Sequence, residues 1–483
     1  MTNAGFYMLA SVPVLLITTG LPAFMILILI ATLFALIGVL MGAVPYQLLQ
    51  AVPQRIVGLL ENDLLQALPL YVLMGALLNR LPLADILFRA GTSLFRRTAA
   101  APLLAALGLG AMLAPMNGSV GASVATLSRI VLPRLHAHRV SNTQGLAAVC
   151  VASTLGVVVP PSLVLILLGD AMLSAHTVAM NITGHVTRAI NTQDVFRGAL
   201  PPAAIFLVLT GGLAWWMGRR RSAAGASAAP RERMGKREWA IAAATLFFVV
   251  GLLAAVVAGY VYAVEAAAAG GMALFVIGVG SRTLTSKALG QVLRDTMAIT
   301  GALFALFVGA TTFTLVVRAF GTDQVIADMI QQIPGGAMGA VLAVMPLLWL
   351  CAFALDAFEI IFVVVPLVMP PLLTRVDDPV WVSVLTLLAL QSSFLLPPLG
   401  YAVMMARTLF PVGVPLRALT RALLPFLAVQ LVVLGLTISF PQVAHLALPA
   451  EPAAFLPPHR LTDKEIEQRL LRQLPPPPSD ADQ

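Results

Sequence analysis

The chain has 483 residues, of which 59% are hydrophobic and only 10% are charged, and its formal net charge is +8. In soluble globular domains about a quarter of the residues are charged, so this composition excludes a soluble globular domain. It predicts a polytopic integral membrane protein with room for about ten spans. Two cysteines and six scattered histidines exclude a disulfide scaffold and disfavour a transition-metal enzyme.

The placement of basic residues predicts the orientation. No Lys or Arg precedes Arg55, so we expect no cleavable signal peptide and an amino terminus on the periplasmic side. The densest basic stretch lies in residues 219–238, within a Ser-, Ala- and Gly-rich linker. Because positively charged loops stay in the cytoplasm, this linker is predicted to be a cytoplasmic loop rather than a nucleic-acid surface.

Apolar runs at the start of the chain predict scaffold helices at 6–19, 22–42 and 66–79, with an interfacial helix at 45–63. Residues 81–97 place three arginines among regularly spaced Leu, Ile and Phe. That pattern is typical of an amphipathic helix, which we expect on the cytoplasmic surface of the membrane.

A re-entrant hairpin is predicted at about 99–133. Its two apolar runs are each too short to cross the bilayer, and they meet at the polar tip Asn117-Gly118-Ser119. Irregular backbone at membrane depth is tolerated where it lines a cavity or binds something. Hydroxyl and amide oxygens at this tip, including that of Ser123, suit a sodium ion.

The next span, 144–168, is interrupted at Pro160-Pro161. The residues that offer hydroxyl and carbonyl oxygens near this break are Ser153, Thr154, Gly156 and Ser162. The more polar stretch 170–194 is expected to be an external loop, after which 195–217 returns to the basic linker. Two structural alternatives stay open: prolines also kink packed helices, and Ser or Thr hydroxyls also bond back to their own helix.

The second half repeats this order. Expected elements are spans near 239–258, 264–280 and 296–319 with a basic interfacial stretch (Arg282, Lys287, Arg294) between the last two, a hairpin at about 338–373, a helix at 380–409 broken at Pro397-Pro398, and a span at 422–440. An odd number of crossings separates the two tips, so the hairpins open to opposite sides. We therefore predict an all-α membrane protein of two inverted-topology repeats, 1–218 and 239–441, followed by a polar, Pro-rich tail at 442–483 with a short charged helix at 461–472.

Paired hairpin tips and broken helices in inverted halves are typical of secondary transporters, in which unwound carbonyls hold sodium and helix amino termini face an anion. Asp356 and Glu359 lie one helical turn apart in the second hairpin. An intramembrane carboxylate is a functional candidate because its ionised burial costs at least ~2.5 kcal/mol without a partner. Alternatively, both carboxylates reach water at the outer end of the hairpin.

In their joint order, several segments make the chain similar to the large membrane subunit of TRAP (tripartite ATP-independent periplasmic) transporters over about residues 6–440. The matching segments are Leu68–Ala76, Asn117–Ser123, Gly145–Ser162, Asp194–Ala199, Asp356–Ile360 and Leu390–Gly400. The variants VGAS, DAFEI and LQSSFL resemble the branch often labelled mannitol/chloroaromatic type.

This resemblance implies a bacterial inner-membrane transporter of the elevator type that uses a sodium gradient and no other cofactor. The implied partners are a small four-helix membrane subunit and a periplasmic binding protein that delivers an organic acid anion. The implied sodium-site residues are Asn117, Gly118, Ser119, Ser123, Thr154 and Gly156 in the first half and Asp356, Ser392, Ser393 and Gly400 in the second.

The chain departs from the family pattern at Leu396, where Thr is usual, and at Ala389, where Asn is usual. Because leucine lacks the threonine hydroxyl, position 396 does not offer the expected ligand beside the second proline pair. An alternative function is a self-sufficient ion-coupled anion carrier that needs no binding protein. A membrane-embedded enzyme or channel is a third hypothesis, disfavoured because titratable residues do not cluster and no phosphate loop occurs.

Overall fold

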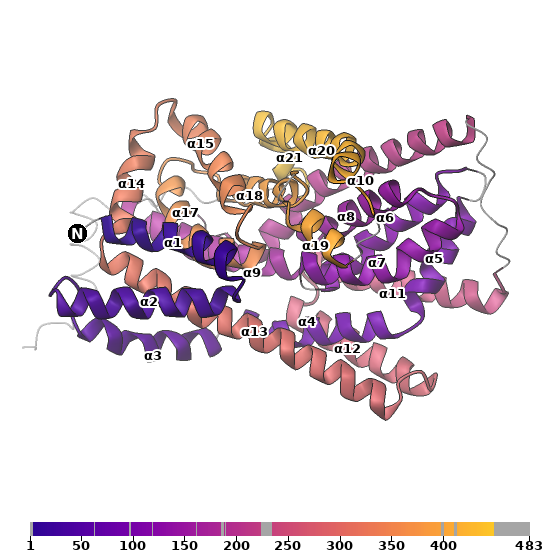
Figure 1. Ribbon diagram of the computed structural model, residues 1–483, viewed down its shortest axis with the longest axis horizontal. Helices are drawn as coiled ribbons and strands as arrows, with labels where there is room; N and C mark the ends of the chain where they lie inside the picture. Colours follow the sequence, from indigo (N-terminus) through magenta and orange to yellow (C-terminus); the bar gives the residue numbers. More distant parts are fainter. Residues whose placement is uncertain are drawn as a thin grey trace, which may run out of the picture. The chain divides into compact units, whose positions relative to one another are not determined.

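Every regular element in the part of the chain that the structure describes is a helix, which confirms the all-α prediction (Figure 1). The computed structural model describes residues 3–61, 63–95, 98–117, 119–160, 162–184, 188, 190–223, 234–397, 400–409 and 413–448. The predicted tail helix at 461–472 and residues 224–233 of the basic linker lie outside these residues.

Seven helical segments among the described residues are long and apolar enough to cross a membrane. An eighth arises if the bent pair α4 (Asp63–Arg80) and α5 (Leu83–Leu94) counts as one span. The seven are formed by α2 (Ala23–Leu40), α8 (Asn142–Val158) joined to α9 (Leu163–Thr183), α10 (Thr192–Ala223), α11 (Lys236–Ala258), α12 (Ala263–Gly280), α13 (Ser286–Ala319) and α20 (Leu416–Ser439). About ten were expected, not counting the hairpins; α1 (Asn3–Thr19) and α18 (Pro379–Ser393) are shorter than the other spans, and α4 counts only together with α5.

One group of helices is built around α13, which runs beside α2 and α4, while α4 also packs along α12 (Figure 1). Gly270 of α12 contacts Met74 of α4 so closely that a Cβ atom would overlap the Met74 sulfur. Small residues thus allow the two backbones to approach, as is usual where membrane helices pack. The amphipathic helix α3 (Gln47–Leu60) also packs against α13.

Helical hairpins occupy both of the regions in which the sequence predicts them. The first consists of α6 (Ala101–Leu113), the 3-10 turn η1 (Ala114–Asn117) and α7 (Val120–Ala137). The second consists of α15 (Gly336–Cys351), α16 (Ala357–Glu359), the π-turn η2 (Ile360–Val364) and α17 (Val365–Leu373). Their re-entrant placement in the bilayer stays a prediction.

A broken helix follows each hairpin. The first break separates α8 from α9, and the residues Val159, Pro160 and Ser162 lie between them. The second separates α18 (Pro379–Ser393) from α19 (Tyr401–Leu409). In both halves a hairpin is therefore followed by a broken helix, whereas the division into inverted repeats 1–218 and 239–441 stays a prediction.

One expectation about local structure is wrong. The stretch 170–194 is not one external loop, because α9 continues to Thr183 and buries Met172, Ala175 and Ala179 along one face. The basic stretch before 296–319 partly belongs to α13, which begins at Ser286, and its interfacial placement stays a prediction. The short helices α14 (Thr322–Gln332) and α21 (Gln442–His445) were not predicted, because neither carries a long apolar run.

Candidate functional site

The first hairpin tip is organised by two serine side chains. Ser119 is the N-cap of α7, and its Oγ accepts a hydrogen bond from the Ala122 backbone N–H at 3.1 Å. The Ser123 hydroxyl donates to the Ser119 carbonyl at 2.9 Å, so the two predicted site residues are joined. The side chain of Asn117 and all of Gly118 lie outside the described part.

At the first break, Ser162 is the N-cap of α9 and accepts from the Leu165 backbone N–H at 3.1 Å. Ser153 and Thr154 each donate to a carbonyl of the preceding turn, at 2.7 and 2.9 Å. These bonds are the structural alternative given above, in which a Ser or Thr hydroxyl bonds back to its own helix. Each uses the hydroxyl's single proton and leaves an oxygen lone pair that can still face a cation. Pro161 lies outside the described residues.

The tip and the break meet at a narrow, closely packed crevice. Its lining residues come from η1, α7, α8 and α9 and are Ala114, Ser119, Val120, Ser123, Ser153, Gly156, Val157 and Val164. A Cβ atom on Gly156 would lie 2.5 Å from the Ala114 carbonyl oxygen, so only glycine permits this approach. The structure therefore brings Ser119, Ser123 and Gly156 together, whereas Thr154 and Ser162 lie in the adjoining turns.

The ends of the helices around this crevice carry opposite partial charges. The amino termini of α7 and α9 contribute Val120 and Val164, and helix amino termini favour anions. The last turn of α8 contributes Gly156 and Val157, and the carbonyls that end a helix favour cations. The crevice can thus present oxygen atoms to a cation close to N–H groups that suit an anion.

At the second hairpin tip, Asp356 and Glu359 form a reciprocal capping box. The Asp356 backbone N–H donates to Glu359 Oε2 at 2.5 Å, and Asp356 Oδ1 accepts from the Ala357 N–H at 2.7 Å. Both residues are half-buried. The amino terminus of a helix stabilises negative charge, so this pair has a structural role in the tip whether or not it also contacts an ion.

The second break begins before its prolines. α18 ends at Ser393, and Pro397 lies in the turns that follow. This earlier ending is consistent with the steric restriction that proline places on the residue before it. A Cβ atom on Gly400 would lie 2.6 Å from the Phe394 carbonyl oxygen, which also accepts the Ala402 N–H at 3.1 Å. Pro398 lies outside the described residues.

Ser392 and Ser393 are both buried at the end of α18 but differ in their bonding. The Ser393 hydroxyl donates to the Leu390 carbonyl at 2.7 Å. The Ser392 hydroxyl donates to the Ala389 carbonyl at 2.9 Å and also accepts the Trp349 indole N–H at 3.0 Å. Ser392 therefore connects the second broken helix to the first helix of the second hairpin.

Tyr401, which sequence reasoning missed, joins the two halves. A Cβ atom on Gly121, at the start of α7, would lie 3.0 Å from its hydroxyl oxygen. Its ring centroid lies 6.2 Å from that of Phe394, and the residue is within electrostatic range of Asp356 and Glu359. The signal in the sequence was an aromatic residue directly after Gly400, which by itself indicates no partner.

Other contacts also interlock the halves. α19 packs against α7 and α8, and α17 packs against α9. The Cys150 thiol of α8 lies 3.7 Å from the Ala402 carbonyl oxygen of α19. Each broken helix thus contacts the hairpin of the opposite half. No group of three or more His, Cys, Asp or Glu suited to a metal ion occurs among the described residues.

Comparisons with known proteins agree with this architecture. A family model described as "Tripartite ATP-independent periplasmic transporter, DctM component" matches residues 10–443. The sialic acid TRAP transporter large permease protein SiaM of Vibrio cholerae is 24% identical, over 80% of this chain and 87% of that protein. The C4-dicarboxylate TRAP transporter large permease protein DctM of Rhodobacter capsulatus is 23% identical, over 81% and 88%.

A solved structure shares the fold. The YdaH transporter of Alcanivorax borkumensis, whose crystal structure is described as having an unusual topology, aligns with a TM-score of 0.58 and 16% identity. The alignment covers 84% of this chain and 90% of that one. At this identity the likeness concerns the fold alone.

Proposed function

Because this chain belongs to the family of DctM components of tripartite ATP-independent periplasmic transporters, we propose that it couples a sodium gradient to the import of an organic acid anion. It is a large permease subunit and not an enzyme. In this proposal sodium is the coupling ion, and no other cofactor takes part.

The crevice between the first hairpin tip and the first break is the observation that carries the proposal. The hydroxyls of Ser119, Ser123 and Ser153 line it, beside the close approach of Gly156 to the Ala114 carbonyl. Hard oxygen donors and unwound carbonyls are the ligands that sodium finds in transporters with broken helices. We therefore place one sodium ion at this crevice.

A second sodium site is proposed from the residues that carry the family motif in the second half, Asp356 at the hairpin tip and Ser392, Ser393 and Gly400 at the break. Leu396 offers no hydroxyl there, and Ala389 contributes only its carbonyl, which accepts from Ser392. Tyr401 connects this region to Gly121 of the first hairpin. Its contact supports coupling of the two sites.

The substrate is proposed only as a class. SiaM is named for sialic acid and the Rhodobacter protein for C4-dicarboxylate, and the chain resembles both to a similar degree. The compounds for which these two relatives are named are organic acids, and the helix amino termini at the crevice favour negative charge. Both observations support an anionic substrate. The mannitol/chloroaromatic label stays a prediction, and we assign selectivity to a periplasmic binding protein that delivers the substrate.

Transport is proposed to follow an elevator motion in the bacterial inner membrane. The hairpins and broken helices, which interlock, would move as one body against the group of α2, α4, α12 and α13. A small four-helix membrane subunit would brace that group. The amino terminus is placed in the periplasm and the linker 219–238 in the cytoplasm, in agreement with the positive-inside rule.

Reconstitution tests this proposal. Vesicles would contain this chain and its cognate small membrane subunit, with the cognate binding protein loaded with the anion that a ligand screen identifies. We expect uptake driven by an inward sodium gradient and its loss in Ser119→Ala/Ser123→Ala. Ser128→Ala is the matched control, because Ser128 is also buried in α7 but does not line the crevice.

Two outcomes would count against the proposal. Uptake that is equal with sodium and potassium gradients would exclude sodium coupling. Full uptake without the binding protein would favour the self-sufficient carrier instead.

A further inference from the structure

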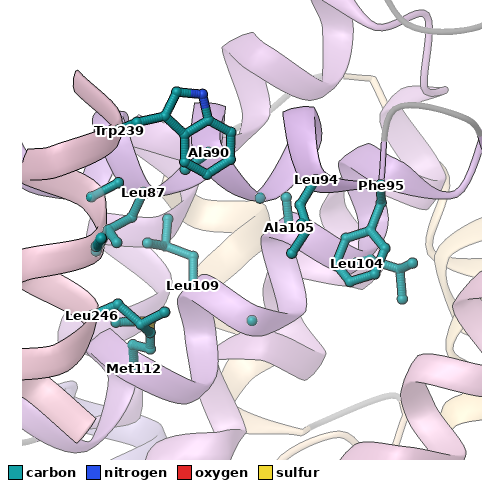
Figure 2. A pocket seen from close by; sticks show the side chains of 14 residues that line it. Leu87, Ala90, Leu94, Phe95, Leu104, Ala105, Leu109, Met112, Trp239 and Leu246 are labelled. Atoms are coloured by element: carbon teal, nitrogen blue, oxygen red, sulfur yellow. The ribbon is translucent and has the colours of Figure 1, made fainter. Parts of the chain in front are cut away.

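An apolar groove lies between α5, α6 and α11, away from the hairpin tips and breaks. Figure 2 shows Trp239 at one end of it and Phe95 with Leu104 toward another. Its lining residues, all apolar apart from the indole N–H of Trp239, are Leu87, Ala90, Gly91, Leu94, Phe95, Leu104, Ala105, Gly108, Leu109, Met112, Trp239, Ala242, Ala243 and Leu246. A groove of this lining selects a hydrocarbon ligand.

The size of the groove suits a hydrocarbon chain. Its volume is about 340 Å³, more than twice the roughly 150 Å³ of an engineered apolar cavity that binds benzene. A Cβ atom on Gly108 would meet no atom within 4 Å, so the groove is open at that point.

The bilayer has direct access to this groove. Within α11 only Ala242, Thr245, Val249 and Val256 are buried, although the helix is apolar enough to cross a membrane. Ala243, which lines the groove, and Trp239 at its end are both exposed. Tryptophan favours the boundary between hydrocarbon and headgroups, so Trp239 places this end of the groove at headgroup depth.

Basic residues gather at the same end. Lys236 and Arg237 are exposed in the first turn of α11, and Arg89 of α5 pairs with Glu238 at 2.7 Å. Lys236 and Arg237, next to the Arg89–Glu238 ion pair, leave a positive field beside Trp239. Basic groups next to a membrane helix attract anionic lipid headgroups.

We propose that this groove binds one acyl chain of an anionic phospholipid whose phosphate contacts Lys236 and Arg237. The apolar lining selects the acyl chain of the lipid, and the basic first turn of α11 selects its headgroup. The bound lipid then fills the space between α11 and α6, the first helix of the first hairpin. This site is independent of the sodium and anion sites proposed above.

Lipid retention by the purified full-length chain tests the site. The detergent-solubilised protein would be incubated with an equal mixture of phosphatidylglycerol and phosphatidylethanolamine of the same chains, and the bound lipid would be counted by native mass spectrometry. We expect a preference for phosphatidylglycerol. Gly108→Leu should weaken its retention about tenfold, because displacement of roughly two buried methylenes suffices for that change.

Further variants separate the contribution of the lipid acyl chain from that of the headgroup. Ala243→Leu fills the groove from the opposite wall and should act like Gly108→Leu if that variant fails to fold. Gly251→Leu is the matched control, since Gly251 lies on α11 with no atom near an added Cβ and outside the groove. Lys236→Gln/Arg237→Gln should keep lipid bound but abolish the preference for phosphatidylglycerol.

Equal retention by the unsubstituted chain and by both groove-filling variants would overturn the proposal. So would the absence of any headgroup preference in the unsubstituted chain. Cross-linking of a photoreactive residue at Ala243 to a protein helix instead of lipid would also overturn it and would assign the groove to a protein partner.

Discussion

Tyr401 packs directly on Gly121, so closely that a methyl group on this glycine would lie 3.0 Å from the tyrosine hydroxyl oxygen. The contact joins the start of α7 in the first hairpin to the residue that follows the second helix break. Tyr401 therefore adjoins both the first hairpin and the second break, each of which carries a candidate ion site.

Removal of the Tyr401 hydroxyl should affect transport more than stability. Tyr401→Phe keeps the ring beside Phe394, so we expect the free energy of unfolding to change by less than about 1 kcal/mol. The sodium concentration for half-maximal uptake should rise, because the polar link between the two sites is lost. Tyr7→Phe, an exposed change in α1, is the control. An unaltered sodium dependence in Tyr401→Phe would exclude this role.

A methyl group at Gly156 should close the first crevice. In Gly156→Ala the new Cβ would collide with the Ala114 backbone, which cannot move aside as a side chain can, and overpacking costs about 1–3 kcal/mol. Gly145→Ala is the matched control, since its nearest atom is a leucine methyl at 3.3 Å. Thermal unfolding and sodium-driven uptake would both be measured. Wild-type values for Gly156→Ala would contradict the close approach.

Asp356→Asn separates capping from charge. Asparagine caps a helix about as well as aspartate, so the stability of the tip should stay within about 0.5 kcal/mol. If the carboxylate contacts the coupling ion, uptake should weaken and require more sodium. Glu359→Gln, which keeps an acceptor for the Asp356 N–H, is the parallel change. Wild-type kinetics in Asp356→Asn would leave the carboxylate with its capping role only.

The two serines that end α18 should differ in their contribution to stability. Ser392→Ala leaves the Trp349 indole N–H without its partner, which costs about 1–3 kcal/mol, whereas Ser393→Ala loses only a bond within its own helix. The double variant Ser392→Ala/Trp349→Phe should recover part of the loss. Equal unfolding free energies for the two single variants would show that the Trp349 bond contributes nothing.

Much of the helical layout could be read from local patterns. Polar, Gly-containing interruptions between apolar runs correctly marked the turn at Ala114–Asn117 and the break around Pro160, because such signals act over a few residues. Polarity was misleading at 170–194. The moderate polarity of this stretch predicted a loop, although much of it belongs to α9, which has a buried face. Pro397 marked the second break, but the helix ends earlier, at Ser393.

The sequence by itself determined that the chain is a helical membrane protein with interrupted helices in both halves, because hydropathy and helix-breaking residues are properties of short segments. Only the tertiary structure decided that Gly156 adjoins Ala114, that Trp349 bonds Ser392 and that Tyr401 reaches Gly121. Those contacts join residues far apart in the chain. They depend on how helices pack and how closely their backbones approach, which no local pattern encodes.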